Sequence, residues 1–139
     1  MKNKKAMQTN ELLSRYAAGQ RDFRNLKLLA ANLRSVNLSG ANLSGANLTH
    51  ANLTKANLRR ANLTGAILTR ANLTQTNLTE ANLTNANLSD ADLSDVNLSQ
   101  AYLHGAIMSD GVSPSSVSKH SKSSLNKDQI GVSLGAGHL

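Results

Sequence analysis

Carboxylates and imidazoles are the side chains of this sequence with the greatest chemical potential. Asp90, Asp92 and Asp95 lie close together and offer oxygen atoms to a hard cation such as Ca²⁺. Calcium loops need more oxygen ligands and a glycine at a fixed position, so these acids make at most a weak cation site. The histidines are scattered, without carboxylates at triad-like or metal-ligand spacing: His50, His104, His120 and His138. With no phosphate loop or nucleophile motif either, we expect no metal, no cofactor and no enzymatic activity.

Basic side chains gather in one part of the chain. Residues 21–75 carry eight basic side chains and one acidic side chain, a net charge of +7, whereas residues 76–110 carry only acids, a net charge of −5. Five basic residues form a candidate interaction patch: Arg34, Lys55, Arg59, Arg60 and Arg70. A basic patch can bind phosphates, but one Phe, two Tyr and no Trp offer few platforms for nucleic-acid bases. We therefore do not expect nucleic-acid binding. The patch is either a solvated face or one side of an attraction between basic and acidic ends.

The segment that positions these side chains is a run of five-residue words. From Arg21 to Asp110 the chain divides into eighteen consecutive words without insertion or deletion, and most read Ala-Asn-Leu-(Ser/Thr)-x. The third residue is Leu in sixteen words, Phe23 in the first and Met108 in the last. A period of five fits neither a helix nor a flat strand, so the chain must turn once in each word. This predicts a solenoid, in which each short unit buries its apolar side by stacking on its neighbours.

The repeated word resembles the motif of the pentapeptide-repeat family, A(D/N)LXX, over about two-thirds of the chain. The resemblance implies an all-β solenoid, a right-handed quadrilateral parallel β-helix with four words in each coil. Leu would fill its axis, and Ala would pack beside Leu. With coils about 4.8 Å apart, eighteen words would make about 4.5 coils and a rod roughly 20–25 Å long.

The remaining positions of the word have expected roles of their own. Ala suits the first position because a narrow interior has no room for two large inward side chains in each word. Asn holds the second position in twelve words and is expected to form amide ladders between coils. Ser or Thr holds the fourth position in thirteen words and is expected to hydrogen-bond nearby backbone at each turn.

Placing the words on four faces brings the exceptions to the motif into columns. Val36, Thr76 and Val96 replace the first-position Ala and fall in one column with Ala56, which predicts a bulkier inner layer on one side of the rod. A second set forms a candidate apolar strip on another face: Leu29, Ile67 and Ile107. Either the two end members of this strip pack under caps, or the strip docks a partner or a second copy.

Residues 1–20 are expected to form a basic segment followed by a short helix that caps the first coil. Thr9 or Asn10 is the expected N-cap, and Gly19 is expected to end the helix. The expected apolar stripe of the helix consists of Leu12, Leu13, Tyr16 and Ala17. The segment LLSRYAAGQRDF is similar to leaders that are common in cyanobacterial members of the family.

The domain organisation that we expect is a cap over residues 1–20, a β-helix over residues 21–110 and a tail over residues 111–139. The tail is rich in Ser and expected to be mostly disordered. Within it, the segment from Leu125 to Leu134 has a few apolar residues and is expected to form a brief helix over the last coil, as a substitute cap. The family often closes this end with a more hydrophobic module, which this sequence lacks.

These features favour a rigid structural or protein-protein interaction module. The expected partner is another protein, and a homo-oligomer is an alternative. The chain has no membrane-spanning run, and its basic start is followed by no apolar stretch, so the expected compartment is the cytoplasm.

An alternative function rests on the resemblance alone. Some members of the family, including those linked to quinolone resistance, resemble double-stranded DNA and bind DNA gyrase in its place. This sequence departs from that pattern in its positive net charge, in acids confined to the last coils, and in about half the number of coils.

Overall fold

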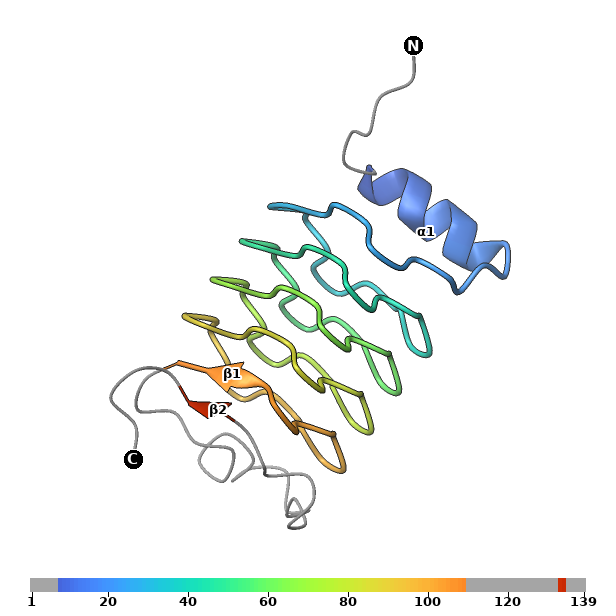
Figure 1. Ribbon diagram of the computed structural model, residues 1–139. Helices are drawn as coiled ribbons and strands as arrows, with labels where there is room; N and C mark the ends of the chain where they lie inside the picture. Colours follow the sequence, from blue (N-terminus) through green and yellow to red (C-terminus); the bar gives the residue numbers. More distant parts are fainter. Residues whose placement is uncertain (1–7, 110–132, 135–139) are drawn as a thin grey trace.

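The computed structural model describes residues 8–109 and 133–134. This part of the chain contains the helix α1 (Thr9–Ala17) and two short strands, β1 (Ile107–Met108) and β2 (Ser133–Leu134). Between α1 and β1 the chain winds in stacked coils, with α1 lying across the first coil and β1 in the last (Figure 1).

Successive coils are joined by parallel pairing between residues twenty positions apart. The pairs run from Asp22 with Asn42 to Asn87 with Ile107, one in every word. In the middle of the rod, the Leu63 N–H donates to the Asn82 carbonyl at 2.7 Å, and the Asn82 N–H donates to the Ala61 carbonyl at 2.9 Å. Four words therefore make one coil, as predicted.

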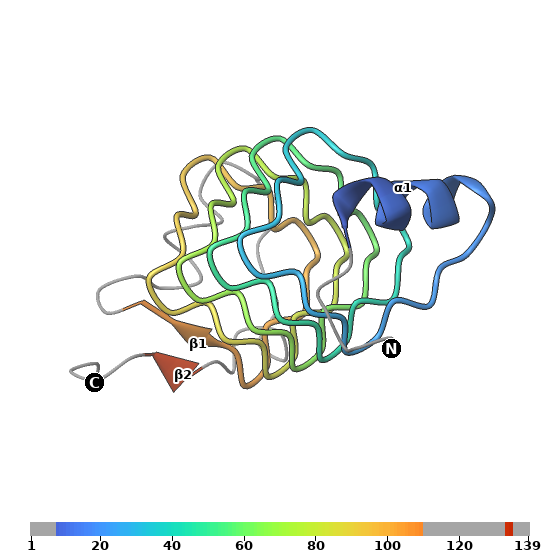
Figure 2. The same ribbon diagram turned by 90° about the horizontal axis from the view of Figure 1, so that it is seen from above.

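The coil has four sides when it is viewed from the α1 end, and the chain turns clockwise as it recedes, so the coil is right-handed (Figure 2). We number the faces in the order in which the chain reaches them. Face 1 is the stack of residues 21–25, 41–45, 61–65, 81–85 and 101–105, and face 2 is the stack of residues 26–30, 46–50, 66–70, 86–90 and 106–109. Face 3 is the stack of residues 31–35, 51–55, 71–75 and 91–95, and face 4 is the stack of residues 36–40, 56–60, 76–80 and 96–100.

The core lies along the axis of the rod and consists of the third residues of the words. These side chains are fully buried from Phe23 to Met108, except for Leu93, which is partly buried. The first-position Ala residues are also buried, except for Ala31 and Ala91 near the two ends. Each buried Leu contributes about 1.5–3 kcal/mol by leaving water, so this column is the main source of stability.

The predicted column of β-branched residues lies on face 4. Thr76 and Val96 are fully buried, and Val36 is partly buried at the N-terminal end. The hydroxyl of Thr76 donates to the Leu53 carbonyl at 2.7 Å. A buried hydroxyl without a partner would cost stability, and this bond removes that cost.

Each word that ends between Asn25 and Gly105 turns at its fifth residue, which adopts a left-handed backbone conformation. The φ angle is positive at all seventeen fifth positions from Asn25 to Gly105, and four of these residues are glycine. The turn is closed by a hydrogen bond from the first residue of the next word, as in Ala61 N–H to the Leu58 carbonyl at 3.0 Å. None of the fifth residues is β-branched, because a branched Cβ makes the left-handed region costly.

This turn conformation predicts opposite effects of two substitutions at Lys55, whose φ is 62°. Lys55→Val should lower the free energy of unfolding by about 1–3 kcal/mol, because a β-branched residue is strained there. Lys55→Gly should leave stability unchanged or slightly higher, because glycine adopts positive φ without strain. Denaturant titrations of both variants check this expectation. Equal unfolding midpoints for the two variants would contradict it.

The second-position Asn closes the turn of its own word. The Oδ1 atom of Asn62 accepts a hydrogen bond from the Thr64 N–H at 3.0 Å and from the Thr64 hydroxyl at 2.6 Å. The same two bonds recur in other words, including those of Asn47, Asn52, Asn77, Asn82, Asn87 and Asn97. The expected roles were therefore wrong in detail. The Asn oxygen bonds within its own word instead of along a ladder, and in these words the hydroxyl bonds the Asn side chain instead of the backbone. Ser109 in the last word follows the expectation, because its hydroxyl accepts a hydrogen bond from the Asp90 N–H at 2.6 Å.

Helix α1 covers the N-terminal end of the core. Leu12 is fully buried and Leu13 and Tyr16 pack against the core, whereas Ala17 is exposed, so Ala17 was wrongly assigned to the apolar stripe. The Tyr16 hydroxyl donates to the Ser39 carbonyl at 2.7 Å, and the Arg21 guanidinium lies 3.7 Å from the centre of the Tyr16 ring. These contacts attach the helix to the first coil.

The N-terminal end of α1 differs from the prediction, whereas its C-terminal end agrees with it. The N-cap is Gln8, without a side-chain hydrogen bond, and Thr9 and Asn10 are already helical, so the predicted N-cap was wrong. The Leu12 N–H donates to the Gln8 carbonyl at 3.0 Å, so the first helical turn already contains Thr9 and Asn10, and residue preference marks the start only approximately. Gly19 follows the C-cap with φ of 103° and ends the helix as predicted.

The last coil is extended by β2, which pairs in parallel with β1. Ile107 pairs with Ser133 and Met108 with Leu134. The predicted helix is therefore wrong for Ser133–Leu134, because the open backbone edge of β1 pairs with an extended segment. Residues 125–132 of that predicted helix, and the other tail residues expected to be disordered, lie outside the described residues. The expected domain limits stay a prediction.

Candidate interaction surface

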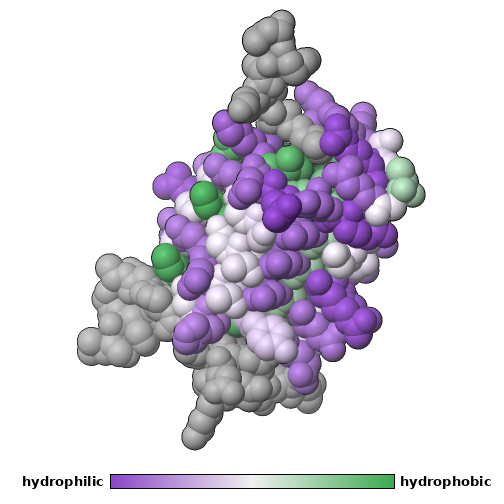
Figure 3. All heavy atoms as spheres, turned by 45° about the vertical axis from the view of Figure 1, so that its right-hand side comes forward, coloured by the Kyte–Doolittle hydropathy of each residue, from purple (hydrophilic) through white to green (hydrophobic). Residues whose placement is uncertain are grey.

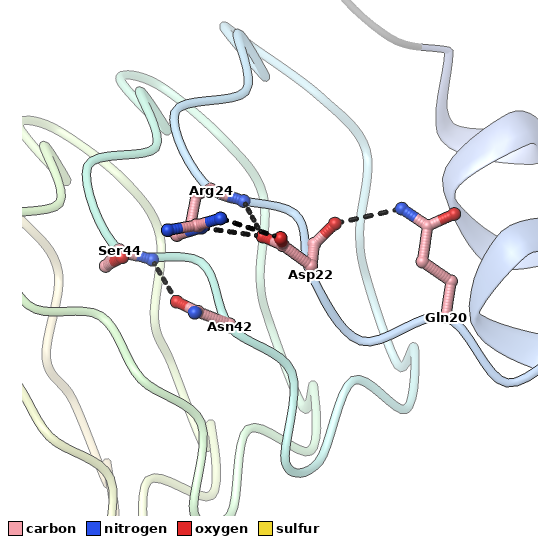
Figure 4. Close-up of polar contacts among 5 residues, drawn as sticks. All are labelled: Gln20, Asp22, Arg24, Asn42 and Ser44. Atoms are coloured by element: carbon pink, nitrogen blue, oxygen red, sulfur yellow. Dashed lines mark hydrogen bonds and ion pairs between the residues drawn. The ribbon is translucent and has the colours of Figure 1, made fainter.

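In the first word of the repeat, Asp22 and Arg24 stand where Asn and Ser or Thr are usual, and their side chains form an ion pair. Asp22 Oδ1 accepts a hydrogen bond from the Arg24 N–H at 3.3 Å, as Asn42 Oδ1 accepts one from the Ser44 N–H at 3.1 Å in the next coil (Figure 4). The Arg24 guanidinium also binds the Asp22 carboxylate at 2.9 Å, which lowers the pKa of Asp22. Gln20, between α1 and the coil, donates to the Asp22 carbonyl at 2.9 Å. The charges of Asp22 and Arg24 thus neutralise each other, and Arg21 leaves the word with a net charge of +1.

The five residues of the candidate basic patch are all exposed but do not share one face. Arg34 and Lys55 belong to face 3, Arg59 and Arg60 belong to face 4, and Arg70 is the last residue of its word on face 2. Fifth residues lie at the corners of the coil, so Lys55, Arg60 and Arg70 occupy three different corners. The patch is therefore a band around three sides of the rod, and its role in binding stays a prediction.

Three of these basic residues pair with acids of the following coil. The Arg60 Nε lies 2.5 Å and the Arg59 guanidinium 3.5 Å from the Glu80 carboxylate, while Arg70 Nε lies 4.0 Å from the Asp90 carboxylate. Arg60 and Glu80, like Arg70 and Asp90, are twenty residues apart, so the coil period itself makes them neighbours. The hydrogen bond from Arg60 lowers the pKa of Glu80, with Arg59 adding to the effect.

Removing the Arg60 charge tests this axial pair. Arg60→Gln should raise the pKa of Glu80 towards its ordinary value near 4.3, because the strongest partner of the carboxylate is lost. A lowered pKa in the folded chain stabilises it above the unfolded pKa, and this contribution is lost as the pH falls through the folded value. The carboxyl ¹³C titration of Glu80 in wild type and variant provides the measurement. Superimposable titration curves would contradict the pairing.

Arg34 and Lys55 differ from the other three basic residues. Neither takes part in the ion pairs formed by the part of the chain that the structure describes. At the opposite end of face 3, Asp92 holds the second position of its word, and its Oδ1 accepts from the Ser94 hydroxyl at 2.7 Å and the Ser94 N–H at 3.0 Å. These bonds lower the pKa of Asp92, so its carboxylate is charged at neutral pH. Face 3 is therefore basic at one end and acidic at the other.

The candidate apolar strip is exposed but discontinuous. Leu29, Ile67 and Ile107 all lie on face 2, with 50%, 38% and 36% of their surface exposed. Asn87 pairs with both Ile residues and separates them, so the strip is interrupted by a polar side chain. The face shown in Figure 3 likewise has separate hydrophobic side chains among polar ones. Docking through this strip stays a prediction.

Sequence reasoning missed Tyr102, which is 52% exposed on face 1. It pairs with Asn82 and stands at the second position of its word, where Asn is usual. The same departure from the motif drew attention to Ile67 and Ile107, so the signal was present in the sequence.

Among residues 8–109 and 133–134 no group of three or more acidic or histidine side chains is arranged to hold a metal ion. The acids proposed as a weak cation site are thus not gathered into such a group. Within the same residues, no helix has both the length and the apolar character to cross a bilayer.

The geometry and the comparisons with known proteins identify the family. The family model described as pentapeptide repeats matches residues 31–70 and 71–110, with eight copies, and the chain belongs to this family. The chain is similar to the solved structure of a pentapeptide repeat protein from the Arabidopsis thaliana thylakoid lumen, with 27% identity, 84% of this chain and 77% of that chain covered, and a TM-score of 0.64.

Two cyanobacterial proteins are also similar. A pentapeptide repeat protein from Nostoc PCC 7120 is 32% identical, with 94% of this chain and 98% of that chain covered and a TM-score of 0.48. HetL from Nostoc sp. strain PCC 7120, a pentapeptide repeat protein involved in heterocyst differentiation regulation, is 36% identical, with 73% and 53% covered and a TM-score of 0.37. A comparison with curated proteins gave no match. The match of the family model confirms the family recognised from the repeated word.

Proposed function

We propose that the chain is a non-enzymatic, rigid module whose outer faces bind another protein. The observation that carries this proposal is the unbroken pairing from Asp22 to Ile107, which holds the outward side chains at a repeat of about 4.8 Å along the rod. A surface whose backbone is already ordered loses little conformational entropy when a partner docks. Membership in a family of repeat proteins supports the structural part of the proposal.

The basic band is the proposed contact region, and its partner is a protein with an acidic surface. Arg34 and Lys55 are exposed and take part in no ion pair within the described residues, so an external carboxylate need not displace an internal one. Arg59 and Arg60 share the single carboxylate of Glu80, which leaves an excess of positive charge at that corner. Complementary charge of this kind speeds encounter and selects between partners.

A charge-neutral variant tests the proposal without disturbing the coil. Each basic residue is replaced by a residue that the repeat itself uses at the equivalent position: Arg34→Ser, Lys55→Gln, Arg59→Thr, Arg60→Gln and Arg70→Gln. Gln75 and Gln100 already adopt positive φ at fifth positions, so the variant should keep the fold. Circular dichroism melts confirm this before binding is measured.

Partners are captured from the native cell with the wild-type chain, identified, purified and titrated against both forms. We expect the neutral variant to bind at least about tenfold more weakly. A matched control, Glu80→Gln with Asp90→Asn, changes two acids on the same corners and should keep or raise the affinity, because it frees arginines from internal pairs. Equal affinity of the wild type and the neutral variant for every purified partner would overturn the basic band as the contact region.

The gyrase-binding alternative receives less support from the charges. A DNA mimic needs a continuous array of acidic side chains, whereas two of the acids here pair with arginines of the preceding coil. A supercoiling assay with and without a quinolone tests the alternative. Inhibition of gyrase, or protection from the quinolone, at tens of micromolar chain would favour the DNA mimic.

We also propose the cytoplasm as the compartment of the chain. Fractionation of native cells with an antibody against the chain tests this. Recovery in a soluble cytoplasmic fraction is expected, and recovery in another compartment would refute it.

A further inference from the structure

Opposite charges along this rod occur in two arrangements. At the fifth positions of faces 2 and 4, opposite charges are one coil apart and form ion pairs within the molecule. These pairs are Arg70 with Asp90 and Arg60 with Glu80. On face 3, Arg34 and Asp92 are separated by three coils, about 14 Å at the usual strand spacing. Because this distance is far beyond an ion pair, Arg34 and Asp92 cannot meet within one chain.

The middle of face 3 is uncharged at the second and fourth positions. Asn52 and Thr54 hold these positions in the second word, and the Thr54 hydroxyl donates to Asn52 Oδ1 at 2.7 Å. In the third word the Thr74 N–H donates to Asn72 Oδ1 at 3.0 Å. The side chains of Asn52, Thr54 and Asn72 are thus tied into the turns of their own words, and the Thr74 side chain bonds Asp92 in the next coil. Lys55 lies at the corner of the second word, so between the corners a second surface can approach the centre of the face without displacing a long charged side chain.

We infer that face 3 binds face 3 of a second copy of this chain in antiparallel orientation. A rotation of 180° about an axis between the second and third words exchanges the two ends of the face. The word that contains Arg34 then opposes the partner's acidic word, 91–95, and the word of Lys55 opposes the partner's neutral word, 71–75. The contact is self-complementary, as a two-fold dimer requires.

Charge excludes the parallel alternative. In parallel orientation Arg34 would face Arg34 of the partner subunit, and Asp92 would face Asp92 of the partner subunit, so both ends of the interface would repel. The inference rests on the proposed function as an interaction module and names one partner for it. It assigns that partner to face 3, and not to the basic band as a whole.

The size of the face sets the strength of this contact. Four words spaced by about 4.8 Å make a face roughly 20 Å long. The area that such a face can bury is well below the ~800 Å² that each partner buries in stable complexes. The dimer is therefore weak, depends on charge, and forms at high local concentration. Added salt screens its ion pairs, since the Debye length falls to about 10 Å at 0.1 M.

The experiment measures self-association of the full chain by sedimentation equilibrium up to about 1 mM chain, the range of weak complexes. Two variants reverse the ends of face 3 separately, Arg34→Glu and the double variant Asp92→Asn with Asp95→Lys. The second is compatible with the turn, because Asn holds the second position and Lys the fifth in the word of Lys55. The matched control is Lys27→Glu, which makes the same charge change on face 2.

We expect wild type and Lys27→Glu to associate alike in about 20 mM salt and about tenfold more weakly in 300 mM salt. Each face 3 variant alone should associate at least about tenfold more weakly than wild type, and an equimolar mixture of the two should recover association. A monomeric wild type at 1 mM in low salt, equal weakening by Lys27→Glu, or no recovery in the mixture would each overturn the inference. None of these results affects the binding of a different protein by the basic band, which the neutral variant tests separately.

Discussion

Leu63→Lys is expected to abolish cooperative folding of the coil. Leu63 is fully buried at the third position of a word in the middle of the rod, with core side chains of the neighbouring coils above and below it. A lysine there would bury an ammonium group without a carboxylate, at an effective cost of several kcal/mol, in addition to the loss of about 1.5–3 kcal/mol of apolar burial. Such a loss is comparable with the whole free energy of unfolding of a typical domain, about 5–15 kcal/mol.

Gly65→Lys is the matched control for this substitution. It places the same charge two residues away at a fifth position, where an added Cβ meets no atom within 4 Å and where Lys55 already stands in an equivalent turn. We expect this control to melt cooperatively within a few degrees of wild type, whereas Leu63→Lys should show no cooperative melt by circular dichroism. A cooperative β-rich melt of Leu63→Lys would mean that the third residues do not fill the axis.

Removal of residues 1–20 is expected to have the second largest effect. It takes away Leu12, which is fully buried against the core, and the hydrogen bond from the Tyr16 hydroxyl to Ser39. Apolar burial of about 1.5–3 kcal/mol and a hydrogen bond of about 1 kcal/mol are lost together, which corresponds to a fall in melting temperature of about 10 °C or more. The uncovered end of the first coil should also promote association, because it presents open core and unpaired backbone.

Two smaller changes separate the contributions of the cap. Removal of residues 1–7 alone keeps Leu12 and Tyr16 in place and should leave the melt nearly unchanged. Tyr16→Phe keeps the ring under Arg21 but deletes the bond to Ser39, and should cost about 1 kcal/mol. If the chain without residues 1–20 melted at the temperature of the full chain and stayed monomeric, α1 would not be the cap.

The regular part of this fold could be predicted from the sequence because one physical requirement acts in every word. A single large inward side chain in each word fixes the Leu column. Val36, Thr76 and Val96, which replace the first-position Ala, are separated by multiples of twenty residues and therefore fall in one column. The hydrogen-bond partners of the Asn and Thr side chains were harder to predict, since both residues form ladders between strands as well as local turns. The absence of β-branched residues at fifth positions was nevertheless a visible sign of the left-handed turn.

The ends of the rod were predicted less well, because they do not repeat. The N-cap was assigned to Thr9 or Asn10 from local preference, but the first helical hydrogen bond runs from the Leu12 N–H to the Gln8 carbonyl, so Gln8 is the cap. The segment that includes Ser133 and Leu134 has too few apolar residues to choose between a helix and a strand. Only the open edge of β1 makes the extended form favourable there.

For the candidate surface, the sequence predicted outward basic residues but not their neighbours. The partners of Arg60 and Arg70 follow from the coil period, because Glu80 and Asp90 stand twenty residues further along the chain. Applying that spacing to each charge would have predicted the ion pairs. It would also have shown that Arg34 and Lys55 have no acid one coil away.

The twenty-residue register is the central claim, because it decides which side chains are neighbours on every face. It is tested most directly by through-hydrogen-bond scalar coupling in NMR, which detects the donor nitrogen and acceptor carbonyl carbon of a single bond. The structure predicts a coupling between the Leu63 nitrogen and the Asn82 carbonyl, and another between the Asn82 nitrogen and the Ala61 carbonyl. Coupling of Leu63 to a carbonyl one word earlier or later, in Asn77 or Asn87, would contradict the register and the faces built on it.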